Sequence, residues 1–393
     1  MKIAMAMEHF SRHAGGAESY AVELARTLVS EQWEVHLYGH SWDGYPEGAV
    51  FHEIPGMPGW VPPSVRILAF ALRHRAMVAR ENFDIVLGFG NTLAMNVYQS
   101  HGGVHYFSNM RKIKAVRNPL LRVLKVLAMF ASPKYHVRAL IESAPFRSPQ
   151  PPVLIAISDM VRNDMADYFC VEKSSIKLVY NGIDNARFGG PKDREAHRLR
   201  EDMGFGDQVL FLFMAYDFRK KGVRNLIEAA ASLRDQVGDK RFGVVVVGRA
   251  PSPALLRMVR RLQLTGIIHF AGPTRQPELY YQACDVFVLP TFYDACSLVV
   301  FEAMAAGLPA ITTVHNGASG IVRGGVDGMI LKNPNDIGEM AHAMSLFLDR
   351  GVLSAASQAA RFTASRYTLK RNHRQMLDVL NEAVRARVRG NLC

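Results

Sequence analysis

Two acids bracket an apolar run in the stretch TFYDACSLVVFEAMAAGLP, residues 291–309. Asp294 and Glu302 lie eight positions apart, and every residue between them is small or apolar. An ionised carboxylate in such surroundings is costly unless it has a partner or a ligand. The pair therefore marks this stretch as a candidate binding site.

The residues around the two acids predict a strand, a loop and a helix. VFVLPT (286–291) is typical of a buried strand, Ser297 can cap the helix that follows, and Gly307 with Pro309 ends it. A helix N-terminus offers free backbone N–H groups and a positive dipole end, which suit a phosphate. An acid in the loop and one in the second turn could accept hydrogen bonds from sugar hydroxyls. A structural interpretation stays open, in which Glu302 is a helix acid favoured by the dipole and Asp294 is an ordinary loop residue.

Two histidines follow a probable strand, in SHGGVH (100–105). His101 and His105 are candidates to orient an acceptor or to take part in proton transfer. A purely structural role is an equally good interpretation for each. The nearby GFGNTL (88–93) departs from the dinucleotide fingerprint at its last position and is weak evidence.

These candidates need a scaffold that brings strand ends together. Strand-like runs at 1–7, 33–39, 83–90 and 152–158 alternate with helical patterns, and a second series opens at 174–182 and continues at 209–215, 243–248, 266–272, 286–291 and 310–313. This alternation predicts an α/β fold of two doubly wound, Rossmann-like domains facing across a cleft. We place the first at 1–180 and the second at 181–366, and expect the helix at 367–393 to pack back on the first.

Composition bounds the class of protein. With 393 residues, 49% hydrophobic and 21% charged, the chain is an ordinary globular protein. Its 4 cysteines are far apart and neither they nor any Asp-x-Asp pair form a metal-ligand pattern, so we expect no metal and no cofactor. We find neither a signal peptide nor a membrane span, which predicts a cytoplasmic protein.

The net charge of +12 is concentrated in one segment. Residues 108–147 carry 9 Lys or Arg and 1 acid, mixed with large apolar residues. A basic amphipathic helix, as in PLLRVLKVLAMF, is typical of a membrane surface element, whereas a nucleic-acid site would need interleaved aromatic residues. A solvated domain face remains the alternative. The residues predicted to meet the anionic membrane are Arg111, Lys112, Lys114, Arg117, Arg122 and Lys125.

Several motifs together carry a family resemblance. Asp294-x7-Glu302 followed by AMAAGLP resembles the E-x7-E motif of retaining glycosyltransferases of family 4, which have two Rossmann-like domains (the GT-B fold). HAGGAESYAVELARTL, VLIAISDMVRNDM, YNGIDNARF and FRKKGVRNLIEAA extend it over nearly the whole chain. GFGNTLAMNVYQSHGGVH, DFRKKGV and YDACSLVVFEA are most similar to lipopolysaccharide core glucosyltransferases.

The resemblance implies residue roles. Glu302 would bind the nucleotide ribose, and Asp294, which stands where the family has Glu, would contact the transferred sugar. A leaving nucleoside diphosphate develops negative charge, which fixed cations stabilise. The basic residues of FRKKG would supply those cations, the amides at the start of the helix would meet the diphosphate, and two glycines near the N-terminus would let the first domain approach it. The residues implied to bind the donor in these ways are Gly15, Gly16, Arg219, Lys220, Lys221, Ser297, Leu298 and Val299.

We therefore expect a retaining enzyme that moves a hexose from a nucleotide diphosphate sugar, with UDP-glucose the favoured donor, to a sugar of a lipid-linked acceptor such as the lipopolysaccharide core. Its partners would be the donor, that acceptor and the inner face of the cytoplasmic membrane, and not nucleic acid. No covalent nucleophile is assigned. The alternatives are a membrane-surface protein that binds sugar nucleotides without turnover, and an epimerase or phosphorylase of the same fold.

Overall fold

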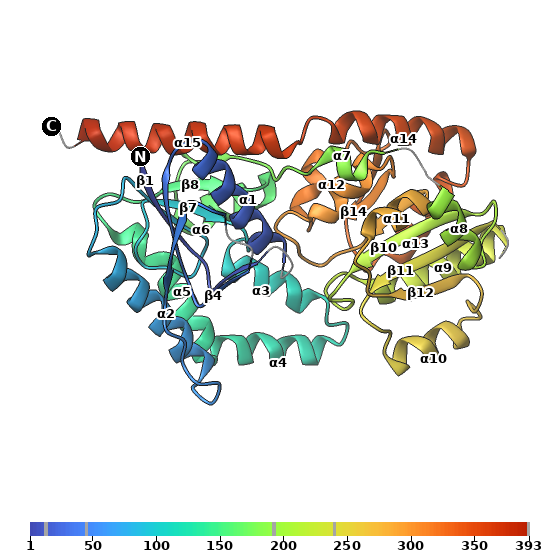
Figure 1. The fold of residues 1–393 in the computed structure, drawn as a ribbon. Coiled ribbons are helices and arrows are strands. Elements are labelled where there is room, and N and C mark those ends of the chain that lie inside the picture. Colours follow the sequence, from blue (N-terminus) through green and yellow to red (C-terminus); the bar gives the residue numbers. More distant parts are fainter. Residues whose placement is uncertain (12–14, 44–45, 191–193, 239–240, 391–393) are drawn as a thin grey trace. The chain divides into compact units, whose positions relative to one another are not determined.

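The computed structural model describes all residues except 12–14, 44–45, 191–193, 239–240 and 391–393. The chain forms two compact units, one of residues 1–180 with 370–393 and one of residues 181–369. Each unit is built on a parallel sheet covered by helices, so the predicted α/β class with two Rossmann-like domains is confirmed (Figure 1).

Unit 1 contains a seven-stranded sheet in the order β5-β3-β1-β6-β7-β8-β9. Its strands are β1 (Lys2–Ala6), β3 (Glu34–Gly39), β5 (Ala49–Glu53), β6 (Ile85–Gly88), β7 (Val97–Ser100), β8 (Val153–Ala156) and β9 (Lys177–Leu178). Two short strands, β2 (His9–Ser11) and β4 (Ser41–Asp43), pair beside it. Its helices are α1 (Gly16–Ser30), α2 (Pro63–Val78), α3 (His105–Lys114), α4 (Pro119–Phe130), α5 (Pro133–Ser143), α6 (Asp159–Phe169) and α15 (Leu369–Gly390).

The alternation along β1 explains how both faces of this sheet are covered. Ile3 and Met5 point to one face, where they share a core with residues of α1 and α15. Ala4 and Ala6 point to the other face, where they meet Phe70 of α2. The C-terminal helix therefore packs in the core of unit 1, through Met376 and Leu380 among others.

Unit 2 contains a six-stranded sheet in the order β12-β11-β10-β13-β14-β15. Its strands are β10 (Val209–Ala215), β11 (Phe242–Gly248), β12 (Ile268–Gly272), β13 (Val286–Leu289), β14 (Ala310–Thr313) and β15 (Gly328–Leu331). Its helices are α7 (Asn185–Phe188), α8 (Arg194–Asp202), α9 (Val223–Val237), α10 (Pro253–Arg261), α11 (Pro277–Ala283), α12 (Leu298–Ala305), α13 (Ile337–Leu346) and α14 (Arg350–Ala364). Valine runs such as that in β11 are buried throughout, as parallel strands covered on both faces must be.

One expectation from the sequence needs correction, and some strands were not predicted. The sequence places the start of the second series of strands at 174–182, but within this run only Lys177 and Leu178 form a strand, which pairs with β8 in the sheet of unit 1. Strands β5 and β15 carry too little periodic signal to be predicted, and β7 is expected only as the strand before His101, without bounds. Short parallel strands are specified by their neighbours more than by their own residues.

Candidate functional site

All strands of the unit 2 sheet are parallel, but the order in which the chain adds them reverses between the neighbours β10 and β13. From β10 the chain continues to β11 on one side, and from β13 it continues to β14 on the other. Loops after two such strands diverge and leave a crevice at the carboxyl edge, where α/β sheets bind ligands. Lys221 lies in the loop after β10, and Asp294 lies in the loop after β13.

Backbone contacts fix these two loops against each other. The carbonyl of Lys220 accepts hydrogen bonds from the Phe292 N–H at 2.9 Å and from the Thr291 hydroxyl at 3.2 Å. Gly222 follows with φ of +79°, and a Cβ there would lie 2.2 Å from the Pro290 carbonyl oxygen. The glycine after the lysine pair is therefore required for the loops to approach.

Lys221 and Asp294 form an ion pair across the crevice. The Lys221 ammonium and the Ser297 hydroxyl both donate to Asp294 Oδ2, and the Cys296 N–H donates to Oδ1 at 3.2 Å. Burial alone would raise the pKa of Asp294, but the charge of Lys221 and these hydrogen bonds hold it below its usual value. Asp294 is thus an anion held beside a cation, with both side chains about one-fifth exposed, at 22% and 20%.

The N-terminus of α12 opens beside this pair. Ser297 occupies the N-cap position, but its hydroxyl bonds Asp294 and caps no backbone N–H. The amides of Leu298 and Val299 are the first of the helix and have no intrahelical partner. Asn316, in the loop after β14, braces the turn by accepting from the Ser297 N–H at 3.3 Å. The result is a helix end with free donors beside a lysine, an arrangement suited to a phosphate.

Glu302 lies one turn further along α12. The hydroxyl of Tyr281, a buried residue of α11, donates to Glu302 Oε2 at 2.8 Å. Burial raises the pKa of Glu302, and this hydrogen bond and the charge of Arg187 oppose the rise. Tyr281 fixes the carboxylate in one orientation, which leaves Oε1 to accept from a ligand.

The other two basic residues of the turn, Arg219 and Lys220, lie further out than Lys221. Lys220 pairs with Asp217 at 3.1 Å, and its side chain is 44% exposed. Arg219 is exposed. Of the three predicted cations, therefore, the structure brings Lys221 into the centre of the crevice and leaves the other two at its rim.

The predicted glycines of unit 1 stand at the start of α1. Gly15 is the N-cap residue in extended backbone, and Gly16 is the first helical residue. A Cβ on Gly15 would meet only the flexible Glu18 side chain. The preceding residues of the predicted loop, 12–14, lie outside the described part of the chain.

The two histidines have different surroundings in unit 1. His101 follows β7, its ring 4.5 Å from that of Tyr20, and burial lowers its pKa to about 3. His105 begins α3, with its backbone N–H bonded to the buried Glu142 at 3.2 Å. Burial and then the charges of Arg138, Lys112 and Lys134 lower the pKa of His105 to about 4. Both rings are neutral at pH 7, so they can act as hydrogen-bonding groups but carry no charge.

The six cations predicted to meet the membrane, within residues 108–147, differ in how far they are buried and in the contacts they make. Arg111 forms an ion pair with Asp164 of α6, and the Arg122 guanidinium donates to the Val116 carbonyl at 3.0 Å. These two predicted membrane residues are therefore held by the protein itself. Lys114, Arg117 and Lys125 are exposed, and Lys112 is half-buried.

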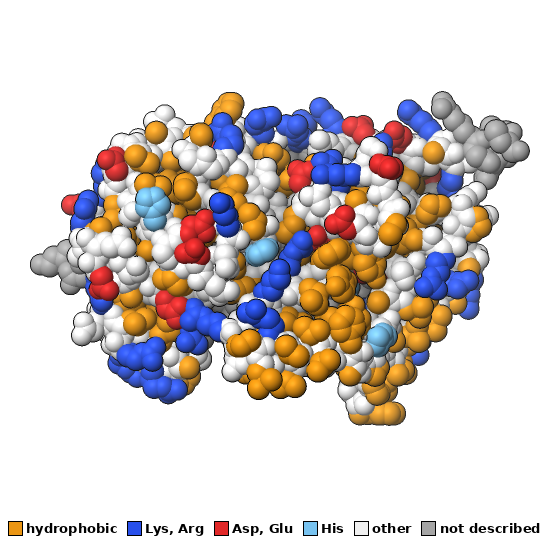
Figure 2. Space-filling model, turned by 180° about the vertical axis from the view of Figure 1, so that it is seen from behind, with side chains coloured by type: hydrophobic (Ala, Val, Ile, Leu, Met, Phe, Trp, Pro, Cys, Tyr) orange, Lys and Arg blue, Asp and Glu red, His pale blue; other side chains and the backbone are white. Residues whose placement is uncertain are grey.

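Helix α4 exposes apolar side chains. None of its residues is buried. Figure 2 shows hydrophobic side chains gathered over α4 at the lower edge of that view (Figure 2). The side chains concerned are Leu120 (67% exposed), Leu121 (50%), Val123 (56%), Leu124 (51%), Leu127 (60%) and Phe130 (46%).

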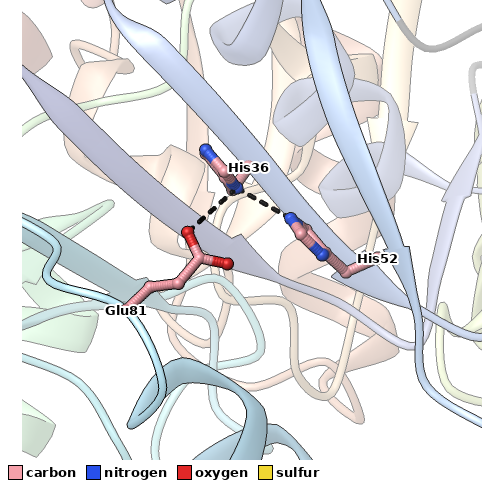
Figure 3. Close-up of side chains that lie close together, drawn as sticks. All are labelled: His36, His52 and Glu81. Carbon is pink, nitrogen blue, oxygen red and sulfur yellow. Dashed lines mark hydrogen bonds and ion pairs between the residues drawn. The ribbon is translucent and has the colours of Figure 1, made fainter.

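One cluster could hold a metal among the residues that the structure describes. His36, His52 and Glu81 bring ligand atoms within 4.8 Å of one another (Figure 3). His36 already bonds His52 at 2.7 Å and Glu34 at 2.9 Å, and Lys2 lies 2.8 Å from the Glu81 carboxylate. A resident ammonium competes with a metal ion there. Because Lys2 and Glu34 begin their strands, the cluster lies toward the amino edge of its sheet, away from the ligand-binding edge.

Sequence reasoning missed three side chains, two around the crevice of unit 2 and one beside His105 in unit 1. Asn316 follows a predicted strand and could have been found as a polar residue at a strand end. Tyr281 has no such signal, since only folding brings α11 against α12. Glu142, which holds the start of α3, lies 37 residues from His105.

Comparison with known proteins identifies the family of the chain. A family model described as "Glycosyltransferase Family 4" matches residues 14–187, and one described as "Glycosyl transferases group 1" matches residues 206–350. The chain is 25% identical over 413 aligned positions to a D-inositol 3-phosphate glycosyltransferase of Streptomyces bingchenggensis, covering 95% of this chain and 86% of that protein. It is 23% identical over 325 positions to the lipopolysaccharide glucosyltransferase WaaG of Escherichia coli, covering 81% and 82%.

Solved structures share the fold. The crystal structure of WaaG superposes with a TM-score of 0.78 at 20% identity, covering 96% of this chain and 99% of that one. HepE of Anabaena, solved in complex with UDP, superposes with a TM-score of 0.71 at 18% identity, covering 97% and 100%.

Proposed function

The chain belongs to the family 4 glycosyltransferases, and on this premise we propose that it transfers glucose from UDP-glucose with retention of the anomeric configuration. The observation that carries the proposal is the Lys221–Asp294 pair at the N-terminus of α12, with Glu302 one turn beyond. The similarity to the lipopolysaccharide glucosyltransferase and to a fold solved with UDP supports the choice of donor.

Each group has a role in this proposal. The diphosphate lies against the Leu298 and Val299 amides, with Lys221 beside it, and Glu302 accepts from the ribose hydroxyls. The leaving UDP gains negative charge as the glycosidic bond breaks, and these preorganised donors stabilise that charge in the transition state. The cations can do this without a metal ion. The departing phosphate accepts the proton of the acceptor hydroxyl on the same face of the sugar.

We also propose that the Lys221–Asp294 ion pair changes when the donor binds. Without donor, Lys221 is neutralised by Asp294. A diphosphate offers the ammonium a stronger anion, and its transfer leaves Asp294 with Ser297 and the Cys296 N–H. The freed carboxylate oxygen can then accept from a hexose hydroxyl. In this proposal, donor binding itself makes the Asp294 carboxylate available to bind the hexose.

For the acceptor we propose a saccharide on a lipid, such as the lipopolysaccharide core, met at the inner face of the cytoplasmic membrane. The exposed apolar side chains of α4, with the exposed Lys125 on the same helix and Lys114 at the end of α3, support this. Apolar side chains enter the interface while each nearby cation adds about 1 kcal/mol at an anionic surface. In the described part of the chain, no helix is both long and apolar enough to cross a bilayer.

A panel of nucleotide sugars tests the donor. The protein should release UDP slowly from UDP-glucose by hydrolysis in the absence of acceptor. Binding without turnover, even with acceptor supplied, would favour a protein that only binds sugar nucleotides. Recovery of an epimerised nucleotide sugar would favour an epimerase.

Vesicle sedimentation tests the membrane surface. Replacing the exposed leucines of α4 by serine should reduce binding to phosphatidylglycerol-containing vesicles at least tenfold and leave UDP-glucose hydrolysis intact. Matched replacements on α14 should change neither. Equal vesicle binding by both sets would contradict the assignment of α4. The test set is Leu120→Ser, Leu124→Ser and Leu127→Ser, and the control set is Val352→Ser and Phe362→Ser.

A further inference from the structure

A second concave site lies wholly within unit 1. A cavity of about 420 Å³ opens at the carboxyl edge of its sheet, lined by residues that follow β1, β3 and β5 and by one face each of α2 and α5. Its volume is in the range of small-molecule sites. Glu8, at the end of β1, borders the cavity and accepts from Asn91 Nδ2, after β6, at 2.9 Å. The cavity therefore begins beside the neighbours β1 and β6, between which the strand order of this parallel sheet reverses. Ligand sites of α/β domains lie at such points.

Four cations line this cavity, facing one acid. Arg66 and Arg73 come from α2, and Lys134 and Arg138 come from α5, while Glu8 is the single lining carboxylate. Arg66 and Arg73 are two turns apart and Lys134 and Arg138 one turn apart, so each pair lies along one helix face. The two helices pack together through Ile67, Ala71 and Ile141. That packing sets the two basic faces side by side.

None of these four cations has an ion-pair partner among the residues that the structure describes. Arg73 donates to the Pro55 carbonyl, and the Nε of Arg138 is buried with no acceptor among the described residues. Glu142, one turn further along α5, accepts from the His105 N–H and the Tyr98 hydroxyl, and the charge of Arg138 partly opposes the rise that burial causes in the pKa of Glu142. The buried Arg138 Nε carries a cost as long as it has no acceptor, and the mutual repulsion of four cations around one cavity adds to it. An anion with several acceptor oxygens would remove it, and phosphoryl groups match arginine geometry well.

We propose that this cavity binds a phosphate monoester carried by the acceptor saccharide, so that the enzyme selects a phosphorylated acceptor. The cations take the phosphoryl group, and Glu8 and His40 are placed at the strand ends to meet sugar hydroxyls. The Nδ1 of His40 lies 2.7 Å from the Ile54 carbonyl, which leaves the other ring nitrogen to a ligand. This inference rests on the proposed function, because it concerns the acceptor of the same transfer.

Calorimetric titration of the full chain with glucose 6-phosphate, glucose and inorganic phosphate tests the idea. We expect glucose 6-phosphate to bind at least tenfold more tightly than either of the others, with an affinity that falls as salt is raised. If glucose binds as tightly as glucose 6-phosphate, the phosphoryl group contributes nothing to binding and the proposal is wrong. Equal binding of inorganic phosphate would show a general anion site and overturn the assignment to an acceptor.

Charge variants locate the site. Arg66 and Lys134 are exposed, so the double variant Arg66→Gln/Lys134→Gln should fold normally and lose at least tenfold in affinity for glucose 6-phosphate. The control Arg75→Gln/Arg80→Gln removes two exposed cations from or just after the same helix, outside the cavity, and should bind as the wild type does. Unchanged affinity in the first variant, or an equal loss in both, would contradict the proposal. UDP-glucose hydrolysis depends on unit 2 and is measured in parallel, so a failure of the proposed donor chemistry is distinguished from a failure of this cavity.

Discussion

Replacing Lys221 by methionine removes one charge from the crevice of unit 2 and keeps most of the side-chain volume. Asp294 then keeps only its hydrogen bonds from Ser297 and the Cys296 N–H. Removing one partner costs about 3–5 kcal/mol in a buried pair and about 0–1 kcal/mol at the surface. With both side chains about one-fifth exposed (20% and 22%), we expect a loss of about 2 kcal/mol in the free energy of unfolding. For a domain of this size that corresponds to a decrease in Tm of about 4–8 °C.

The same substitution has a predictable dependence on pH. In the wild type the pKa of Asp294 is lowered, so its contribution to stability is present above the unfolded pKa and is lost as pH falls through the folded value. Without Lys221 the effect of burial dominates and the pKa rises, so the ionised carboxylate destabilises the variant at neutral pH. The difference in Tm between wild type and variant should therefore be largest near pH 7 and shrink toward pH 4.

Thermal unfolding between pH 4 and pH 8, with UDP release as the activity assay, measures both effects. We expect kcat for UDP-glucose hydrolysis to fall on the order of a hundredfold, as for loss of one transition-state charge partner. Arg224→Met on α9, whose side chain is 59% exposed, is the matched control and should change neither quantity appreciably. Adding Asp294→Asn to the methionine variant should recover part of the stability but none of the activity. A Tm difference that grows on acidification would refute the reasoning about the pair.

Three further substitutions follow from the site. Glu302→Gln should weaken UDP binding at least tenfold in calorimetry because the ribose loses a charged acceptor, and an unchanged Kd would remove that role. Gly222→Ala should lower the free energy of unfolding by about 2–4 kcal/mol, since it combines a positive φ with a Cβ 2.2 Å from the Pro290 carbonyl oxygen. Its control Gly204→Ala, also at positive φ but in open space, should lose about 1 kcal/mol, and equal losses would show that the contact is unimportant. Asp294→Glu restores the family residue: a new donor preference supports retuning by the shorter acid, a faster rate with the same donor supports a weakened site, and no change makes the difference neutral.

The parts of the site that the sequence predicts are those set by strand ends. Lys221 and Asp294 each follow a buried apolar run, and parallel strands bring their carboxyl ends to one edge. Their direct pairing could not be predicted, because it depends on β10 and β13 being neighbours although 73 residues separate the two side chains. The capping role expected of Ser297 also differs, since its hydroxyl serves Asp294 and leaves the helix end open.

The basic segment shows a second limit of sequence reasoning. Periodicity predicts that α4 has an apolar side, but it cannot tell whether another element covers that side, and in the described part of the chain those side chains stay exposed. Likewise, a count of charges cannot separate Arg111, which pairs with Asp164 on another helix, from the exposed Lys125. Both distinctions depend on tertiary contacts.

The central claim is most directly tested by following UDP-glucose with the purified chain by proton NMR, which reports both cleavage and the anomer first formed. The account predicts that UDP appears and that α-glucose is released before mutarotation, with both signals strongly reduced in Lys221→Met. Release of β-glucose, or the absence of binding and cleavage for every nucleotide sugar tried, would contradict it.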